Sequence, residues 1–464
     1  MGCVGSKDEN PKPTLIETKG PAVLKSPSST PTSNNEPMKP LDVIKQVMSE
    51  ERLETERTEI INDSYRTIET DGTEPSELSE RELSEREAVE SEPLSSLEIQ
   101  ARRSLETGST TYTTGSSGPS RPIEYAVCTQ RGYYPNDLNK PNQDSYSVSL
   151  DFADIEKGSS LFSVYDGHGP KGEVFARFAE NQLPVLMSKY VKEQQKAKAE
   201  KTKVKKKSKV SGVGKLPLLN EKQFQQAATK AHLECNQRML DEHPKNDTLY
   251  SGTTATSVAI HNGKLIVPNC GDSRVLLGVR DRKGGPVVAK ALSRDHTPWR
   301  RDERHRIVKA GGRILSIGQM EGFRPVGDDE FQDRFGDKSP GEKGFQDEYG
   351  DPPRVWLKTK GVPGASFTRS LGDSIANDIG VNAEPEFFSK DITSKDKILV
   401  IASDGVFEFM SNQRVMNICA KASSGIDACE EIVTAAYDEW ITNEGRTDDI
   451  TIIVIYLGDA IPNS

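Results

Sequence analysis

The stretch SLFSVYDGHG occupies residues 160–169. Its apolar run, 161–165, ends directly at Asp166 and Gly167. A short apolar run of this kind predicts a buried strand, which carries its last side chain to the edge of a sheet. A glycine at that point permits the backbone to approach a neighbour closely. The stretch therefore predicts a carboxylate held at the end of a core strand, with His168 beside it.

Four more aspartate sites abut predicted strands, namely Asp404-Gly405 after ILVIAS, Asp272 in NCGDSR, Asp144 after Asn142-Gln143, and Asp448-Asp449 before ITIIVIYL. One Asp-Gly pair usually marks only a turn, but five such sites together are far more specific. Carboxylates gathered at a sheet edge repel one another unless a cation neutralises them. Oxygen ligands favour Mg²⁺ or Mn²⁺, and the chain has too few suitably spaced His and Cys residues for zinc.

The region from residue 121 to 464 alternates short strand patterns with longer helical ones. The expected strands are 160–165, 254–261, 264–269, 274–279, 397–403 and 449–456, and the expected helices are 173–190, 221–242, 301–310, 413–420 and 426–441. Paired strands joined by short turns, such as HNGK at 261–264, predict an α+β fold with antiparallel sheet.

Two segments interrupt this pattern, and both are predicted to be inserted surface loops: 192–216 and 318–353. The first begins with a stretch, 192–209, that holds nine lysines and two glutamates. The favoured interpretation of the lysines is a solvated extension of a helix. The alternatives are contact with acidic lipid headgroups and, with less support, a nuclear-import or nucleic-acid patch.

The first 120 residues differ from the rest in charge and composition. They hold 13 Lys and Arg against 23 Asp and Glu, which accounts for the whole net charge of −10, and they are rich in Pro, Ser, Thr and Glu. The acidic repeat ELSER occurs twice, at 77–86. Such composition predicts a mostly disordered acidic tail. The remaining residues are neutral overall, which argues against a nucleic-acid-coating protein.

Membrane spanning and secretion find no support in the sequence. No apolar run approaches 18 residues, and the N-terminus has no signal-peptide core. The six cysteines show no CxxC pair, which suits reduced thiols in a cytosolic compartment.

The opening residues MGCVGS fit an acylation pattern, with Gly2 as the myristoylation site and Cys3 as a neighbouring palmitoylation site. One myristoyl chain binds membranes only weakly, and a second acyl chain makes the anchor stable. We therefore expect the protein at the cytoplasmic face of a membrane, the plasma membrane being favoured, with a cytosolic pool.

Ten short motifs occur in order between about residues 123 and 458: NQDSY, VYDGHG, SGTTA, NCGDSR, DH-P, RI-AGGRI, FTRSLGD, AEPE, ASDGVFE and TDDIT. In this order they resemble the metal-dependent Ser/Thr protein phosphatases (the PPM, or type 2C, family). The PPRVWL motif before PGASFTRSLGDSIA makes the chain most similar to plant and protist members.

The resemblance implies a sandwich of two antiparallel β-sheets flanked by helices, with two Mg²⁺ or Mn²⁺ ions per subunit and a weaker third. It implies that Asp166 bridges both metals and that the Gly167 carbonyl binds one of them. The second metal would be held by Asp404 and Asp448. It further implies that Asp144 lies just outside the direct metal ligands and acts partly through water. It implies that Asp272 helps to bind the third metal and that His168 donates a proton to the departing oxygen.

Three positions depart from the family pattern. Gln143 stands where many animal members have glutamate, and Asp449 stands where asparagine is common. The phosphate-binding arginine of other members corresponds to Asn139 here. Arg131 and Lys140 are the substitute candidates for phosphate binding.

The expected function is hydrolysis of phosphoserine and phosphothreonine in proteins by a metal-activated water, at a membrane surface. The expected partners are phosphoprotein substrates and that membrane surface, with no nucleic acid and a monomeric state. The main alternative is a membrane-anchored pseudophosphatase scaffold, and the intact acidic set argues against it. A small phosphorylated molecule as substrate is opposed only by the resemblance.

Overall fold

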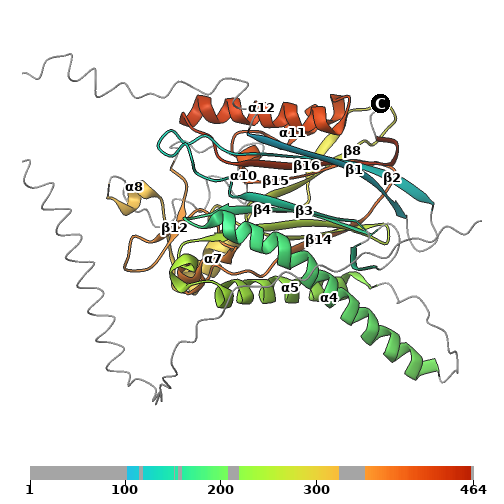
Figure 1. The fold of residues 1–464 in the computed structure, drawn as a ribbon, viewed down its shortest axis with the longest axis horizontal. Helices are drawn as coiled ribbons and strands as arrows, with labels where there is room; N and C mark the ends of the chain where they lie inside the picture. The colour runs from blue at the N-terminus through green and yellow to red at the C-terminus, as the bar shows by residue number, and fades with distance from the viewer. Residues whose placement is uncertain are drawn as a thin grey trace, which may run out of the picture. The chain divides into compact units, whose positions relative to one another are not determined.

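The computed structural model describes residues 102–113, 119–150, 152–154, 159–206, 219–322 and 351–460. Within these residues the chain forms two large antiparallel sheets and a small three-stranded one (Figure 1). The first large sheet has the order β1 (Arg103–Thr113), β2 (Ser120–Gln130), β16 (Ile450–Leu457), β15 (Asp396–Ala402), β8 (Arg274–Val279), β9 (Val288–Ala291).

The second large sheet carries the strand predicted from SLFSVYDGHG near its centre. Its order is β13 (Leu371–Gly372), β5 (Gly252–Thr253), β4 (Ser160–His168), β6 (Ala255–His261), β7 (Lys264–Cys270), β14 (Glu386–Asp391), and β3 (Asp144–Leu150) also pairs with β4. The small sheet consists of β10 (Arg313–Leu315), β11 (Arg354–Trp356) and β12 (Pro363–Ala365).

Helices cover the outer faces of the two large sheets (Figure 1). The long helices α4 (Gly172–Lys206) and α5 (Glu221–Glu242) pack on the second sheet, and α11 (Asn412–Lys421) and α12 (Gly425–Glu444) pack on the first. The shorter elements are α6 (Lys245–Thr248), α7 (Arg301–Lys309), α8 (Ile317–Met320), α9 (Ser374–Asn377), α10 (Asp404–Phe407), and the 3₁₀ turns η1 (Phe152–Asp154) and η2 (Gly458–Ala460). The expected α+β sandwich is therefore confirmed.

The sequence of β16 shows why its run of apolar residues is continuous. Ile452, Val454 and Tyr456 face the core beneath α11 and α12, whereas Ile453 and Ile455 face the core between the two sheets. Side chains alternate across a strand, so a strand with a core on each face needs apolar residues at every position. β15 alternates in the same way between these two cores.

Local signals set the ends of the helices on each side of the sandwich. Asn220 and Gln223 form a reciprocal capping box at the start of α5. The Ser424 hydroxyl accepts a hydrogen bond from the Asp427 N–H at the start of α12. The helix ends at Gly445, whose positive φ of 64° is a conformation that glycine adopts readily.

The N-terminal boundary expected at residue 120 is wrong. β1 pairs with β2 along its whole length, from Arg103 opposite Gln130 to Thr113 opposite Ser120. The mainly polar, exposed sequence of β1 gives no clear alternation, because an edge strand needs only one partner to satisfy its backbone. Residues 1–101 and 114–118 of the predicted tail lie outside the described residues.

The lysine-rich segment is a helix rather than a loop as far as Lys206, because it continues α4 without a break. This agrees with the helix-extension interpretation and corrects the start of the insertion expected at 192–216. Most of the second expected insertion, residues 323–350, lies outside the described residues. Among the helices that the structure describes, none combines the length and apolar character needed to cross a bilayer.

Candidate metal centre

The central carboxylate, Asp166, lies near the end of β4, directly opposite Asp144 at the start of β3. The neighbouring Gly167 donates its N–H to the Gln143 carbonyl at 3.1 Å. A Cβ at Gly167 would lie 2.3 Å from the Gly172 carbonyl oxygen and 2.4 Å from that of Gln143. Because no side chain fits there, the glycine is what allows the two strands to bring their aspartates together.

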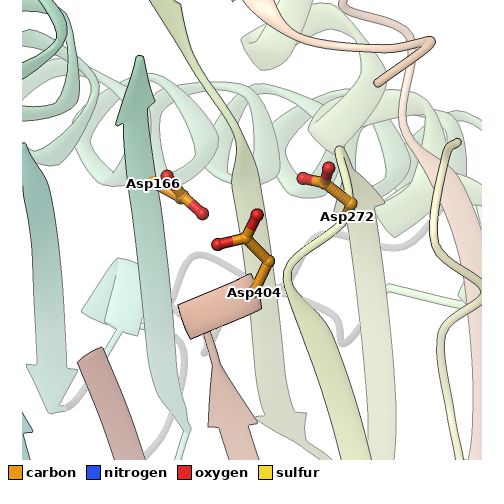
Figure 2. A group of neighbouring side chains, drawn as sticks. All are labelled: Asp166, Asp272 and Asp404. Carbon is orange, nitrogen blue, oxygen red and sulfur yellow. The ribbon is translucent and has the colours of Figure 1, made fainter. Parts of the chain in front are cut away.

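Two further strand ends deliver their aspartates to the same place. β15 ends at Ala402, which lies opposite Arg274, the first residue of β8. Asp404, just after β15, therefore becomes a neighbour of Asp272, which lies in the turn just before β8. Figure 2 shows the carboxylates of Asp166, Asp272 and Asp404 pointing toward one another. One oxygen from each lies within 4.8 Å of the others. Three of the sequence-predicted metal ligands therefore converge on one space.

The charges in this group oppose one another. Burial raises the pKa of Asp166 well above its usual range, and the charges of Asp404 and Asp144 raise it further. Burial, then the charges of Asp272 and Asp448, does the same for the pKa of Asp404. Burial and the charge of Asp295 raise the pKa of Asp272 to about 6. A divalent cation among these oxygens would relieve the repulsion, so the donor set fits Mg²⁺ or Mn²⁺.

The other two predicted ligands lie at the border of the group. Asp144 accepts a hydrogen bond from the Ser403 hydroxyl at 2.8 Å, so a residue beside Asp404 orients it. Asp448 accepts hydrogen bonds from the Tyr134 hydroxyl at 2.5 Å and from the Asp449 N–H at 2.9 Å. It lines the same cavity as Asp272 and Asp404, and its charge raises the pKa of Asp404.

Asp449 has a different task from its neighbour. It accepts the backbone N–H of Gly132 at 2.6 Å and that of Gln143 at 2.8 Å. These bonds fix the loop before Asp144 to the start of β16. Burial and the charge of Asp448 nevertheless raise the pKa of Asp449 to about 6.

The two candidates for phosphate binding are placed differently. Lys140 lies over the Tyr134 ring, 3.7 Å from its centroid, and Tyr134 in turn contacts Asp448. Lys140 is thus at the rim of the acidic group. Arg131 directly follows β2, and in the described part of the chain no hydrogen bond or ion pair connects its side chain to the acidic group.

His168 ends β4 and meets a carboxylate that the sequence did not single out. Its Nε2 lies 2.7 Å from Oδ2 of Asp373, and its ring lies 4.1 Å from the Phe367 ring, centroid to centroid. A carboxylate only accepts, so Nε2 carries the proton in this bond. Asp373 is 4% exposed and also accepts the Ser370 hydroxyl at 2.6 Å. The motif FTRSLGD contained this aspartate, but no local feature of the sequence announces a partner 205 residues away.

A cavity of about 310 Å³ opens beside the acidic group. Its lining includes the carboxylates of Asp272, Asp404 and Asp448 as well as Arg354 and Arg446. A third arginine in its wall, Arg274, is 1% exposed and forms a two-point ion pair with Asp295. The sequence analysis missed all three arginines. The predicted acylation sites, Gly2 and Cys3, lie outside the described residues.

Comparison with known proteins identifies relatives over most of the described region. Residues 144–445 match the family described as Protein phosphatase 2C. A protein of Arabidopsis thaliana named Probable protein phosphatase 2C 35 is 34% identical over 339 residues, which is 73% of this chain and 85% of that protein. Probable protein phosphatase 2C 64 of Oryza sativa subsp. japonica is 31% identical over 318 residues, 68% of this chain and 62% of that protein.

The fold is also similar to a solved structure. The serine-threonine phosphatase 2C from Toxoplasma gondii superposes with a TM-score of 0.51 at 18% sequence identity. The match covers 76% of this chain and 99% of that one. At this level of identity the likeness concerns the fold alone.

Proposed function

This chain belongs to the protein phosphatase 2C family and is a protein serine/threonine phosphatase, and we propose that it works through two divalent cations held by Asp166, Asp404 and Asp448. The observation that carries the proposal is the convergence of carboxylate oxygens from Asp166, Asp272 and Asp404 within 4.8 Å. The raised pKa values of these groups support it, because a site that lacks its own counter-charge is suited to an external cation.

Each residue has a distinct part in this proposal. Asp166 is placed centrally, with Gly167 beside it to offer a backbone carbonyl. Asp144, oriented by Ser403, lies just outside the direct ligands and would contact the metals partly through water. Asp272 is available to a third, weaker ion. Bound Mg²⁺ or Mn²⁺ would neutralise phosphoryl charge and make a water molecule a better nucleophile at neutral pH.

His168 would donate a proton to the serine or threonine oxygen as it leaves phosphorus. A general acid at this step typically contributes 10²–10⁴-fold to the rate. Asp373 holds the imidazole by its Nε2–H, and Ser370 holds Asp373, so the ring is kept in one orientation. The Phe367 ring beside the imidazole limits its rotation further.

The test is hydrolysis of a phosphothreonine peptide by the full chain with Mn²⁺ and with EDTA. We expect activity that requires the metal and is lost in Asp404→Asn. A matched variant, Asp391→Asn, removes an exposed carboxylate that pairs with Lys264 and should retain the activity. Metal-independent turnover, or turnover in Asp404→Asn equal to that of the parent chain, would reject the two-cation mechanism.

We further propose that acyl groups on Gly2 and Cys3 tether the enzyme to the cytoplasmic face of a membrane. The support is the sequence pattern MGCVGS and the known need for two anchors for stable binding. The test is fractionation of cells that express the parent chain, Gly2→Ala or Cys3→Ser. Gly2→Ala should move to the soluble fraction and Cys3→Ser should distribute between both. Membrane retention of Gly2→Ala would exclude this tether.

A further inference from the structure

The far end of α4 carries a positive charge that neither the packing of the helix nor the cation site uses. Residues 194–206, which we call the lysine segment, contain six lysines and one glutamate and belong to the helix throughout. Lysines three or four residues apart on a helix repel one another. The helix dipole favours cations in the last turn, which explains the last three lysines but not the three that precede them. An extended anionic partner would account for all six.

The lysine segment continues past the helix against which the rest of α4 packs. Just before it, Glu193 pairs with Lys230 of α5 at 4.0 Å, and Gln195 is still buried. From Lys196 to Glu200 every side chain is exposed or half-buried. Figure 1 shows the end of α4 running beyond α5 and beyond the sheets. At a rise of about 1.5 Å per residue the segment is about 20 Å long, so it offers an extended surface rather than a pocket.

Five lysines of α4 share one face of the helix, because three, four or seven residues separate each from the next. They are Lys189, Lys192, Lys196, Lys203 and Lys206. Leu183 and Met187, which are buried in the core beneath α4, lie on the opposite face of the helix. Lys189, at the inner end of this row, pairs with Glu234 of α5 at 3.3 Å, so the outer lysines carry the argument. A large flat surface can meet the row from the side that faces away from the core.

The residue types in the lysine segment fit a membrane surface better than a nucleic acid. The segment has no arginine, whose planar fork binds a phosphate at two points, and no aromatic ring on which a base could stack. Lysine acts as a point charge, so its attraction to anions needs no fixed geometry. Val204 is the only large apolar residue of the segment, which favours contact at the level of the headgroups over insertion. Each lysine near an anionic bilayer strengthens binding about fivefold.

We propose that the lysine segment binds anionic lipid headgroups at the cytoplasmic face of the membrane and so holds this end of α4 against the bilayer. The inference deepens the proposed function, because it rests on the membrane tether proposed at Gly2 and Cys3. One acyl chain together with a basic patch binds a membrane far more stably than the acyl chain alone. At physiological ionic strength salt screens the lysines, so the segment by itself does not retain the chain, and Gly2→Ala should still be soluble in cells.

The experiment uses the full chain as Gly2→Ala, produced without acyl groups, so that only the protein surface is tested. Its partition onto phosphatidylcholine vesicles with and without phosphatidylserine is measured by sedimentation at low ionic strength. We expect binding only to the vesicles that contain phosphatidylserine, and a steep loss of binding as salt is added. Lys196→Gln, Lys203→Gln and Lys206→Gln combined should weaken that binding about a hundredfold.

The matched control combines Lys283→Gln, Lys290→Gln and Lys309→Gln, which remove the same charge from exposed positions outside α4 and should leave the binding close to that of the unsubstituted segment. Circular dichroism checks that both triple variants are folded. No binding to phosphatidylserine vesicles, or equal losses in the two triple variants, would overturn the proposal. Tighter binding to a single-stranded oligonucleotide through the same three lysines would overturn it too, by assigning the segment to nucleic acid. The acyl tether is judged separately, by the fractionation of Gly2→Ala in cells, and the phosphatase activity by peptide hydrolysis.

Discussion

Two sites in this molecule bury carboxylate charge, and they differ in whether the chain itself supplies the counter-charge. Glu303 on α7 accepts hydrogen bonds from Arg369 at 2.7 Å and from Thr368 at 2.8 Å, and Arg306 pairs with it as well. Burial alone would raise the pKa of Glu303, but the two arginines outweigh it and hold the pKa far below its usual range. At Asp166 burial and neighbouring carboxylates both raise the pKa.

The difference shows how a structural carboxylate can be told from one that awaits a ligand. Glu303 receives its counter-charge from its own chain, so it ties α7 to the segment around Thr368 and needs nothing from solution. Asp166 has only acidic neighbours among the strongest charges that act on it, so its counter-charge has to come from outside. Burial is common to both, and the partner decides the role.

The largest effect is expected from Asp166→Asn. The amide cannot bridge two cations, and loss of that electrostatic stabilisation should lower kcat/KM about a thousandfold or more. The thermal midpoint of the metal-free variant should equal or exceed that of the parent chain, because a buried repulsion is removed. Phosphopeptide kinetics and calorimetry check the two parts. A large fall in the thermal midpoint would place Asp166 with Glu303, as a structural carboxylate.

Glu303→Gln should show the converse behaviour. It leaves Arg306 and Arg369 without their anionic partner, at a cost of about 3 kcal/mol in the free energy of unfolding. The activity per folded molecule should change little, since Glu303 is absent from the acidic group and from the cavity wall. Urea unfolding and active-site titration separate these effects. If stability stays the same while turnover drops, the contrast with Asp166 is lost.

The pH dependence of stability should distinguish the aspartates of the acidic group from Glu303 without any kinetic measurement. Burial raises the folded-state pKa of Asp272 to about 6, so the folded metal-free chain binds more protons than the unfolded chain between about pH 4 and 6. Its stability should therefore fall by about 2 kcal/mol as pH rises through that window. The lowered pKa of Glu303 has the opposite sign, and its contribution is lost as pH falls below about 4.5.

Calorimetry of the EDTA-treated protein across pH 4–7 checks this prediction. Asp272→Asn should flatten the loss at higher pH, and Mn²⁺ should reverse that loss in the parent chain. Glu303→Gln should flatten only the loss at lower pH. Identical pH profiles for both variants would show that the two groups do not differ in their need for a counter-charge.

The smallest effect is expected at a third kind of buried carboxylate, Asp373, whose partner is the imidazole of His168. Asp373→Asn should lower kcat about tenfold on phosphoserine peptides, with little change in KM, because the proton donor is less well oriented. The loss should be smaller on p-nitrophenyl phosphate, whose leaving group needs less protonation. A loss of equal size on both substrates would assign Asp373 a structural role like that of Glu303.

Much of the fold was predictable because its central strands have strong local signals. The continuous apolar runs of β4, β15 and β16 indicated buried strands, and the aspartates at their ends indicated the acidic group. β1 gave no such signal, since an exposed edge strand is defined by its partner more than by its own residues. The lysine-rich end of α4 was ambiguous because a solvated helix and a charged loop share the same composition.

The site was predictable only where its residues lie in sequence beside a strand. Asp166 and Asp404 met that condition, and the structure brings them together with Asp272. Asp373, Arg354 and Arg446 reach the site from segments without an apolar run, so only tertiary folding places them there. The ion pair of Glu303 with Arg369 was likewise invisible, because these two residues become neighbours through tertiary folding alone, whereas Arg306 lies three residues further along the same helix.

The alternation of side chains in β16 has a consequence for the two aspartates that precede it. Asp448 and Asp449 are chemically identical, yet one contacts Tyr134 near the acidic group and the other holds the backbone of Gly132 and Gln143. Their roles are set by the phase of the strand they lead into. Deleting one residue from β16 would exchange the side chains that enter each core. The aspartate pair could then no longer make its contacts with Tyr134 and with the backbone of Gly132 and Gln143 while β16 keeps its apolar residues in the cores. The number of residues between this aspartate pair and the core positions of β16 is therefore constrained as much as the residue types are.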